Sequence, residues 1–267
     1  MKKTAFVVIS CDNYSDLWPM FIHFFEKNWA DCPLDKYFIT NNKSIPACSF
    51  KEIKIGEDIS WSNGLIKALN ILEDNYSQVL ITLEDVPIIR RVETDLFLEI
   101  TEQFEEINGN YLKFITNYKQ PKSYNVNFGI IPKGSLYRPT AAYALWNIKT
   151  FISLLRKEEN AWEFERFGSV RSDVFDGFYE VNTNFFKILN TVIKGKWVSK
   201  AHLKVEKLGY QHNNNNKRKK LTFKESLFIK LNHFIYYLFT QIIPWKYRRK
   251  IVFKVKNINK LSKNLTI

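Results

Sequence analysis

Short apolar runs alternate with amphipathic segments along the first half of the chain. Runs rich in β-branched and aromatic residues predict buried strands at 4–10, 36–40, 79–83 and 111–115. Apolar residues recurring every three or four positions predict helices at 18–29, 65–72 and 94–107. Strands that alternate with helices predict an α/β fold, a single Rossmann-type domain with a mostly parallel central sheet.

The pattern is less regular beyond this alternation. Residues 50–55 alternate apolar and charged side chains, which is typical of a half-exposed edge strand. Residues 119–139 are rich in proline and glycine, so we expect a long loop or a small hairpin there. A buried strand at 140–146 and a helix at 149–157 follow.

The last fifty residues differ from the rest. A polar and basic stretch at 211–220 is expected to be a linker, which divides the chain into a domain at 1–210 and a helical tail at 221–267. Thr222 and Glu225 form a capping box in front of an apolar run, so an amphipathic helix is predicted as far as Pro244. Polar residues interrupt this run too often for it to cross a bilayer.

Charge is concentrated in the tail. Residues 217–267 contain 14 Lys and Arg and a single acid, whereas residues 1–216 carry equal numbers of both signs. A nucleic-acid-binding protein is therefore the weaker hypothesis, because the domain has no basic surface pattern. The basic, amphipathic tail predicts an anionic membrane surface as partner. Without a signal-peptide pattern, and with three cysteines that lack metal or redox spacing, we expect a cytoplasmic protein that is peripheral on the inner face of the membrane.

Polar side chains follow two of the predicted strands. Glu84 and Asp85 end the strand at 79–83, at the carboxyl edge where open α/β sheets bind ligands. Two carboxylates there can hold a divalent cation, although they also fit a solvated turn. Asp12 and Tyr14 follow the first strand and are candidates for contacting a base and ribose; a capping Asp and a packed Tyr are the alternative.

Asn63-Gly64-Leu65 on a helix, then the 79–83 strand and Glu84-Asp85, resembles the order of elements in GT-A nucleotide-sugar transferases. The resemblance implies a GT-A-like fold, a nucleotide-sugar donor, UDP-linked, and a Mn²⁺ or Mg²⁺ ion. It assigns Asn63, Glu84 and Asp85 to donor binding and Asp85 to the metal. The sequence departs from the family pattern because it has no literal Asp-x-Asp.

A second resemblance follows the 140–146 strand. Trp162-Glu163-Phe164-Glu165 and the Gly168-Ser169 pair are similar to bacterial glycosyltransferases of surface-polysaccharide assembly, which make lipopolysaccharide O-antigen or capsule. These enzymes add a sugar to a lipid-linked or lipopolysaccharide acceptor. The general base of an inverting enzyme would be Glu163 or Glu165, with Glu163 favoured because it follows Trp162. Two solvated acids on an amphipathic segment are the alternative, and a retaining enzyme would need neither.

The leading hypothesis is therefore a metal-assisted glycosyltransferase acting on a lipid-linked or lipopolysaccharide glycan. A non-catalytic, membrane-recruited module with the same fold is the main alternative, because the acidic motif is degenerate.

Overall fold

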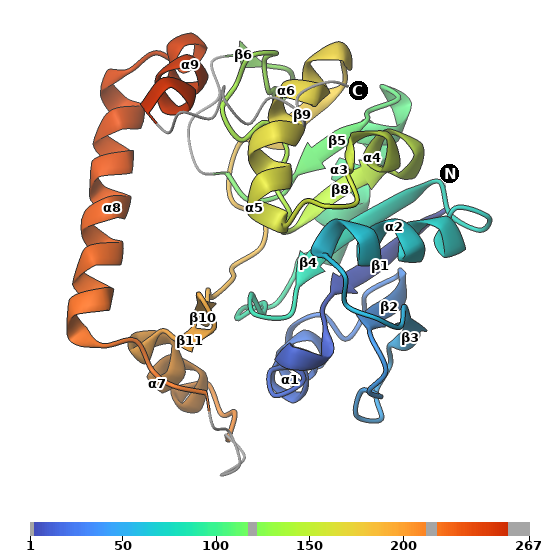
Figure 1. Cartoon of the computed structure of the whole chain (residues 1–267). Helices are drawn as coiled ribbons and strands as arrows, with labels where there is room; N and C mark the ends of the chain where they lie inside the picture. Colours follow the sequence, from blue (N-terminus) through green and yellow to red (C-terminus); the bar gives the residue numbers. More distant parts are fainter. Residues whose placement is uncertain (1–2, 117–121, 212–217, 256–267) are drawn as a thin grey trace.

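The protein is described by a computed structural model that covers residues 3–116, 122–211 and 218–255. Its centre is a nine-stranded sheet with the strand order β3-β2-β1-β4-β8-β5-β9-β7-β6 (Figure 1). Among the described strands only β7 and β8 run against the others. The predicted α/β fold with a mostly parallel sheet is confirmed.

The elements follow the chain in two groups. The first group is β1 (Thr4–Ile9), η1 (Asp12–Tyr14), α1 (Trp18–Asn28), β2 (Asp35–Thr40), β3 (Lys51–Lys54), α2 (Trp61–Leu72), β4 (Gln78–Leu83), α3 (Thr94–Glu106) and β5 (Tyr111–Lys113). The second is β6 (Lys122–Ser123), β7 (Phe128–Ile130), β8 (Ala144–Asn147), α4 (Ile148–Leu154), α5 (Ala161–Glu163), the π-helix η2 (Phe164–Gly168), α6 (Ser169–Arg171), η3 (Ser172–Val174), β9 (Phe178–Val181), β10 (Val192–Ile193), β11 (Lys196–Trp197), α7 (Ser199–Lys207), α8 (Phe223–Ile242) and α9 (Trp245–Val255).

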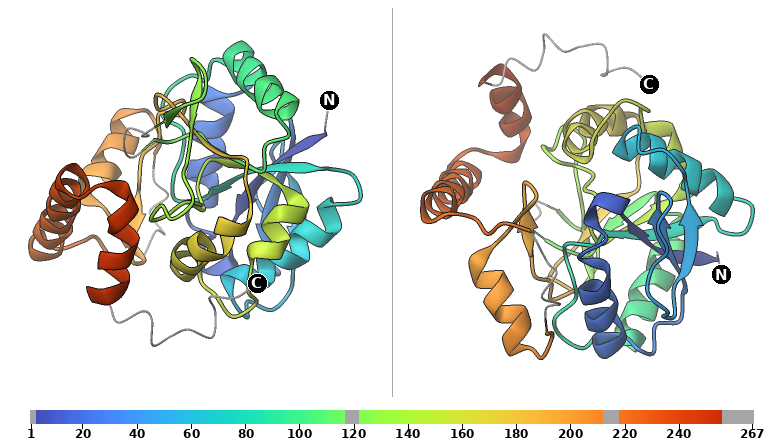
Figure 2. Two further views of the ribbon diagram at one scale, coloured as in Figure 1. Left: turned by 90° about the horizontal axis from the view of Figure 1, so that it is seen from above. Right: turned by 60° about the horizontal axis from the view of Figure 1, so that its bottom comes forward.

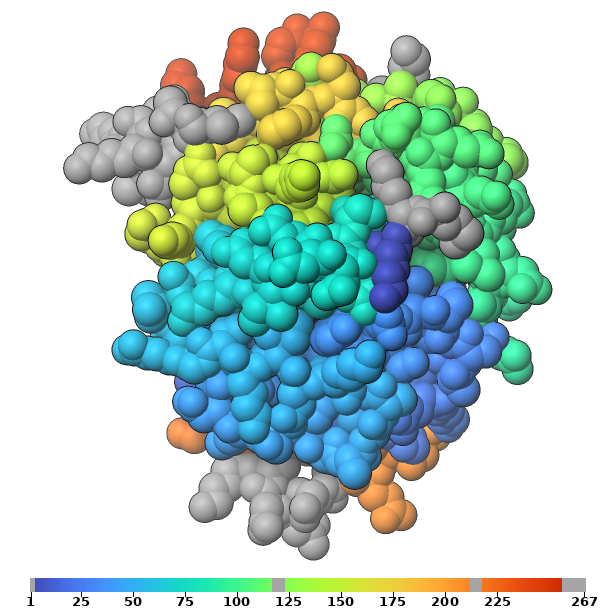
Figure 3. Space-filling model, turned by 90° about the vertical axis from the view of Figure 1, so that its right-hand side faces the viewer, coloured from blue at the N-terminus to red at the C-terminus, as the bar shows by residue number. Residues whose placement is uncertain are grey.

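Both faces of the sheet are covered by helices (Figure 2). Phe6 and Val8 of β1 belong to an aromatic-rich core shared with α1 and α3. Ala5, Val7 and Ile9 belong to a second core shared with α2 and α4. This alternation is the period of two that a strand imposes on its side chains. On the side away from α8, α2 and α4 lie next to each other (Figure 3).

The small hairpin that was one of two expectations for 119–139 is present, and several other short elements were not predicted. The 119–139 segment contains a hairpin of β6 and β7, and its residues 119–121 lie outside the described residues. The 140–146 run becomes a strand only at Ala144, because Tyr143 before it has a φ of 46°. β9, β10, β11 and α9 come from runs too short or too charged to show a clear period.

The predicted tail is a pair of helices. The Thr222–Glu225 capping box is present at the start of α8, and α9 returns to the sheet domain (Figure 1). Part of the predicted linker, 212–217, lies outside the described residues. The rest is bound to the domain, since Trp197 donates to the Lys219 carbonyl at 2.8 Å. None of the described helices is long and apolar enough to span a membrane.

A buried ion pair fixes the segment between α4 and α6. Arg171 donates to both carboxylate oxygens of Glu159, and neither side chain is exposed. The backbone carbonyl of Glu159 also accepts from Ser62 of α2 at 3.1 Å. The pair therefore joins the helices that carry Asn63 and Glu165.

We expect Glu159→Gln to lower the free energy of unfolding by about 3–5 kcal/mol, because it leaves the Arg171 charge buried without a counter-charge. The shift of the urea unfolding midpoint measures this loss. Lys133→Ala, which breaks the exposed Lys133–Asp176 pair, is the matched control and should leave the midpoint unchanged. Equal midpoints for the two variants would contradict the structural role of the buried pair.

Candidate active site

Three strand ends lie side by side at one edge of the sheet. β2, β1 and β4 are parallel neighbours, and Ile9 is paired with Leu83. Ser10 and Glu84 therefore leave the sheet next to each other. The loops that carry the predicted donor residues meet at this edge.

Glu84 and Asp85 are desolvated acids. Burial raises the pKa of the Glu84 carboxyl well above its ordinary value, and the neighbouring Asp85 raises it further. Burial also raises the pKa of Asp85 to about 6. Thr191 holds the Asp85 carbonyl through its N–H at 2.9 Å and its hydroxyl at 2.7 Å. The Oδ1 atom of Asp85 is buried and has no hydrogen-bond partner within the described ranges.

The two acids fit a divalent cation that shares its ligands with a phosphate. Mg²⁺ usually binds through one or two carboxylates together with substrate phosphates and water. No group of three or more His, Cys, Asp or Glu side chains forms a complete metal site in the part of the chain that the structure describes. Asp85 Oδ1 is the atom that would coordinate the ion, with Glu84 beside it. The metal at Asp85 stays a prediction.

Asp12 holds the neighbouring loop. Its carboxylate accepts the backbone N–H groups of Asn41, Asn42 and Lys43 at 3.0 to 3.1 Å. Burial acts to raise the pKa of Asp12, but these hydrogen bonds outweigh it and lower the pKa. Asp12 thus fixes the loop that follows β2. A direct contact of Asp12 with the base or ribose stays a prediction, and it would require some of these hydrogen bonds to break.

Tyr14 is covered on one face by Arg218, whose guanidinium lies 4.6 Å from the ring centre. Arg218 also pairs with Asp16 at 2.6 Å and donates to the Gly195 carbonyl at 3.0 Å. Its charge lowers the pKa of both Glu84 and Asp85, against the larger effect of burial. Sequence reasoning missed Arg218 because it lies in the predicted linker.

Asn63 lies in the first turn of α2, which Ser60 caps by accepting the Asn63 N–H at 3.0 Å. The side-chain oxygen of Asn63 is buried and finds no hydrogen-bond donor among the residues described. Gly64 allows α2 to approach Ile55, because an added Cβ would come within 2.4 Å of that side chain. A buried amide that lacks a partner is suited to a ligand contact, as predicted for Asn63.

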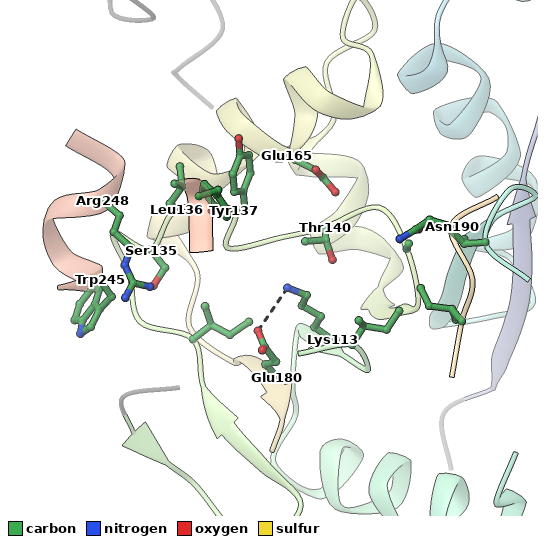
Figure 4. Close-up of a pocket in the computed structure, with 16 residues that line it drawn as sticks. Lys113, Ser135, Leu136, Tyr137, Thr140, Glu165, Glu180, Asn190, Trp245 and Arg248 are labelled. Atoms are coloured by element: carbon green, nitrogen blue, oxygen red, sulfur yellow. Dashed lines mark ion pairs between the residues drawn. The ribbon is translucent and has the colours of Figure 1, made fainter. Parts of the chain in front are cut away.

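A cavity of about 420 Å³ adjoins the acids. Val86, the residue after Asp85, lines it, and the Val86 carbonyl accepts from the Tyr143 hydroxyl at 2.8 Å. Figure 4 shows that Thr140 lies near its centre, with α9 on one side and Asn190 on the other. The lining residues Val86 and Asn190 are the chain neighbours of Asp85 and Thr191, so the cavity lies beside the predicted donor edge, although Glu84 and Asp85 do not line it.

Only one of the two candidate bases lines the cavity. Glu165 lines it, accepts the Ala141 N–H at 3.0 Å, and has its pKa raised by burial. Glu163 instead accepts the Asn160 N–H at 3.0 Å in a capping box at the start of α5. Glu165 is therefore the better-placed of the two acids, although the sequence favoured Glu163.

Lys113 and Glu180 form the floor of the cavity (Figure 4). They are paired in register on β5 and β9, with 3.6 Å between the ammonium and the carboxylate, and both are almost fully buried. Burial has the largest effect on the pKa of Glu165 and raises it. The Ala141 hydrogen bond and the charge of Lys113 lower it, and the effect of Lys113 is the smaller of these two. Sequence reasoning missed this pair, though a lysine inside the apolar 111–115 run was the available signal.

No protein-family model matches the sequence, and no match was found among the curated proteins. The fold is similar to that of S. aureus TarS, with a TM-score of 0.50 and 10% identity over 77% of this chain and 38% of that chain. It is also similar to UTP-bound UGPase from Acinetobacter baumannii, with a TM-score of 0.51 and 9% identity over 88% of this chain and 99% of that chain. At these identities the likeness establishes the fold, which this chain shares with both proteins.

Proposed function

We propose that this protein is a glycosyltransferase that moves a sugar from a nucleotide-sugar donor, UDP-linked, to a lipid-linked or lipopolysaccharide glycan. The observation that carries the proposal is a cavity that contains Glu165 and lies beside Glu84 and Asp85, since Val86, the residue after them, lines it. The A. baumannii UGPase, whose fold is similar, is bound to UTP, and this supports a uridine nucleotide as part of the donor.

The donor would bind at the edge formed by β2, β1 and β4. Asp85, with Glu84 beside it, would hold the Mn²⁺ or Mg²⁺ ion. When bound, the ion neutralises charge that develops on the leaving diphosphate. Glu84 and Asp85 are both buried, and the low dielectric around them strengthens their attraction for a cation once they are ionised.

The acceptor hydroxyl would bind in the cavity, within reach of Glu165. An inverting enzyme needs a base that removes the hydroxyl proton as the new bond to the sugar forms. Burial raises the pKa of Glu165, which makes its carboxylate a stronger base. The Ala141 N–H fixes one carboxylate oxygen and leaves the other for the acceptor.

The tail would bind an anionic membrane. Leu227, Leu231 and Phe234 of α8 are each more than half exposed, although they are large and apolar. Such a patch on a helix marks an interaction surface. The strongly basic composition of 217–267 favours anionic lipids as the occupant, because each Lys or Arg near the surface contributes about 1 kcal/mol.

We expect Asp85→Asn to abolish Mn²⁺-dependent release of UDP from a UDP-sugar, and Glu84→Gln to weaken it, because both remove charge from the cation site. Binding of Mn²⁺ by the wild type should weaken as the pH drops below about 6, because the proton that the metal-free Asp85 takes up there competes with the ion. Asp74→Asn, an exposed acid at the other end of β4, is the control. Metal-dependent release that survives Asp85→Asn would sink the assignment, and its absence in the wild type would favour a non-catalytic module.

We expect Glu165→Gln to lower the rate of sugar transfer by about 10²–10⁴, because a positioned base is lost. The affinity for the UDP-sugar should not change, which calorimetry can measure. Glu163→Gln is the matched variant, and its transfer rate should stay near that of the wild type. If both variants transfer sugar at the wild-type rate, the base lies elsewhere or the enzyme is retaining.

We expect the triple variant Leu227→Gln, Leu231→Gln, Phe234→Gln to bind vesicles of phosphatidylglycerol and phosphatidylcholine more than about ten-fold more weakly, because it removes apolar area from the interface. Wild-type binding should also weaken as salt rises. Co-sedimentation measures both effects. Ile71→Gln, Leu96→Gln, Leu203→Gln removes exposed apolar side chains elsewhere and should bind like the wild type. If the wild type is a dimer and the first triple variant is a monomer, the exposed face of α8 binds a second copy of the chain instead of a membrane.

A further inference from the structure

The C-terminal arm, defined here as α8 and α9 (residues 223–255), forms one wall of the cavity. Tyr236 of α8 and both Trp245 and Arg248 of α9 line the same space as Glu165. Figure 4 shows Trp245 and Arg248 entering from α9, across the cavity from Asn190. The arm therefore takes part in the site as well as carrying the exposed apolar face.

A buried arginine anchors the arm to the cavity loop, defined here as residues 131–140. Arg249 of α9 is 8% exposed, and its guanidinium donates twice to the Ser135 carbonyl, at 2.7 and 3.1 Å. It also donates to the Ser169 carbonyl at 2.9 Å and pairs with Asp173. A charge-assisted network of this kind is strong and directional, so the position of α9 is fixed.

Two further contacts join the arm to the cavity loop. The rings of Tyr236 and Tyr137 lie 6.3 Å apart, edge to face. Gly134, with a φ of +87°, runs past Trp245, and a Cβ placed there would lie 3.8 Å from its ring. The wall residues on both helices are thus held against the loop that supplies Ser135, Tyr137 and Thr140 to the cavity.

The chemistry of this wall suits a glycan. Aromatic rings pack against the apolar faces of sugars, while hydroxyl and amide groups orient their hydroxyls. Tyr236 and Trp245 supply the aromatic part, and Thr140 and Glu165 line the same cavity. Arg248 lies beside them, and its orientation is set by hydrogen bonds to the Ile243 carbonyl, at 2.7 Å, and the Thr240 carbonyl.

We propose that the C-terminal arm is the outer half of the acceptor subsite, with Tyr236 and Trp245 in contact with the acceptor glycan. The inference rests on the proposed function and assigns the acceptor side of that site. Helix α8 carries both the wall residue Tyr236 and the exposed apolar face. An acceptor attached to a membrane lipid would therefore pass along the arm on its way to Glu165. Membrane binding and acceptor binding then use the same two helices.

Matched aromatic substitutions test the inference. The probe is decyl diphosphate-linked N-acetylglucosamine, a short-chain form of a lipid-linked glycan, and its binding to the full chain is measured by calorimetry without vesicles. Tyr236→Ala and Trp245→Ala should each weaken binding about ten-fold, the factor that about 1.4 kcal/mol represents. Tyr237→Ala and Tyr247→Ala remove exposed neighbours on the same helices and should leave binding unchanged.

Release of UDP from a UDP-sugar, measured in parallel, separates the two proposals. Weaker probe binding by Tyr236→Ala and Trp245→Ala, with UDP release intact, supports the arm as acceptor wall. Equal effects of all four variants overturn it, as does a wild-type chain that releases UDP but does not bind the probe. A chain that binds the probe through Tyr236 and Trp245 without releasing UDP would support the wall and overturn the proposed glycosyltransferase.

Discussion

Parallel pairing of β1 with β4 is the constraint on which the candidate site depends. Because the two strands run in the same direction and in register, Ser10 and Glu84 must leave the sheet at the same edge. The loop after β2 joins them through the hydrogen bonds of Asp12. Thr191 then holds the Asp85 carbonyl, and burial raises the pKa of the Asp85 carboxyl to about 6.

Charged pairs fasten the C-terminal part of the chain to the rest of the domain. Arg218 reaches Asp16, Arg249 reaches Asp173, and each partner lies far away in the sequence. A partly buried pair of this kind adds little net stability, because desolvation opposes the attraction between the charges. Its geometry is nevertheless specific. These pairs therefore determine where the tail lies, more than how stable the domain is.

The extent of prediction differed between elements for physical reasons. The strand at 79–83 and the helix at 94–107 were readable because burial imposes a strong period on their apolar residues. The same periodicity could not decide between Glu163 and Glu165 as the base. Residues two apart on an α-helix point about 200° apart, so only one of the two can face the site, but the sequence does not show which one. The Asn160-x-x-Glu163 capping box was a signal for the role of Glu163. The π-helix at Phe164–Gly168 had no such signal, and turns of this kind often mark functional sites.

The arm combines two features that a single structural role does not explain. A tail that only bound a membrane would need the exposed side chains of α8 but not the buried Arg249. A tail that only completed the domain would need Arg249 and Phe253 but would not leave Leu227 and Leu231 in water, where their apolar area opposes folding. A site that receives its substrate from a membrane needs both. The proposed function would account for both features, because one helix would be free to bind a surface and the next would be fixed at the cavity where the bound molecule reacts.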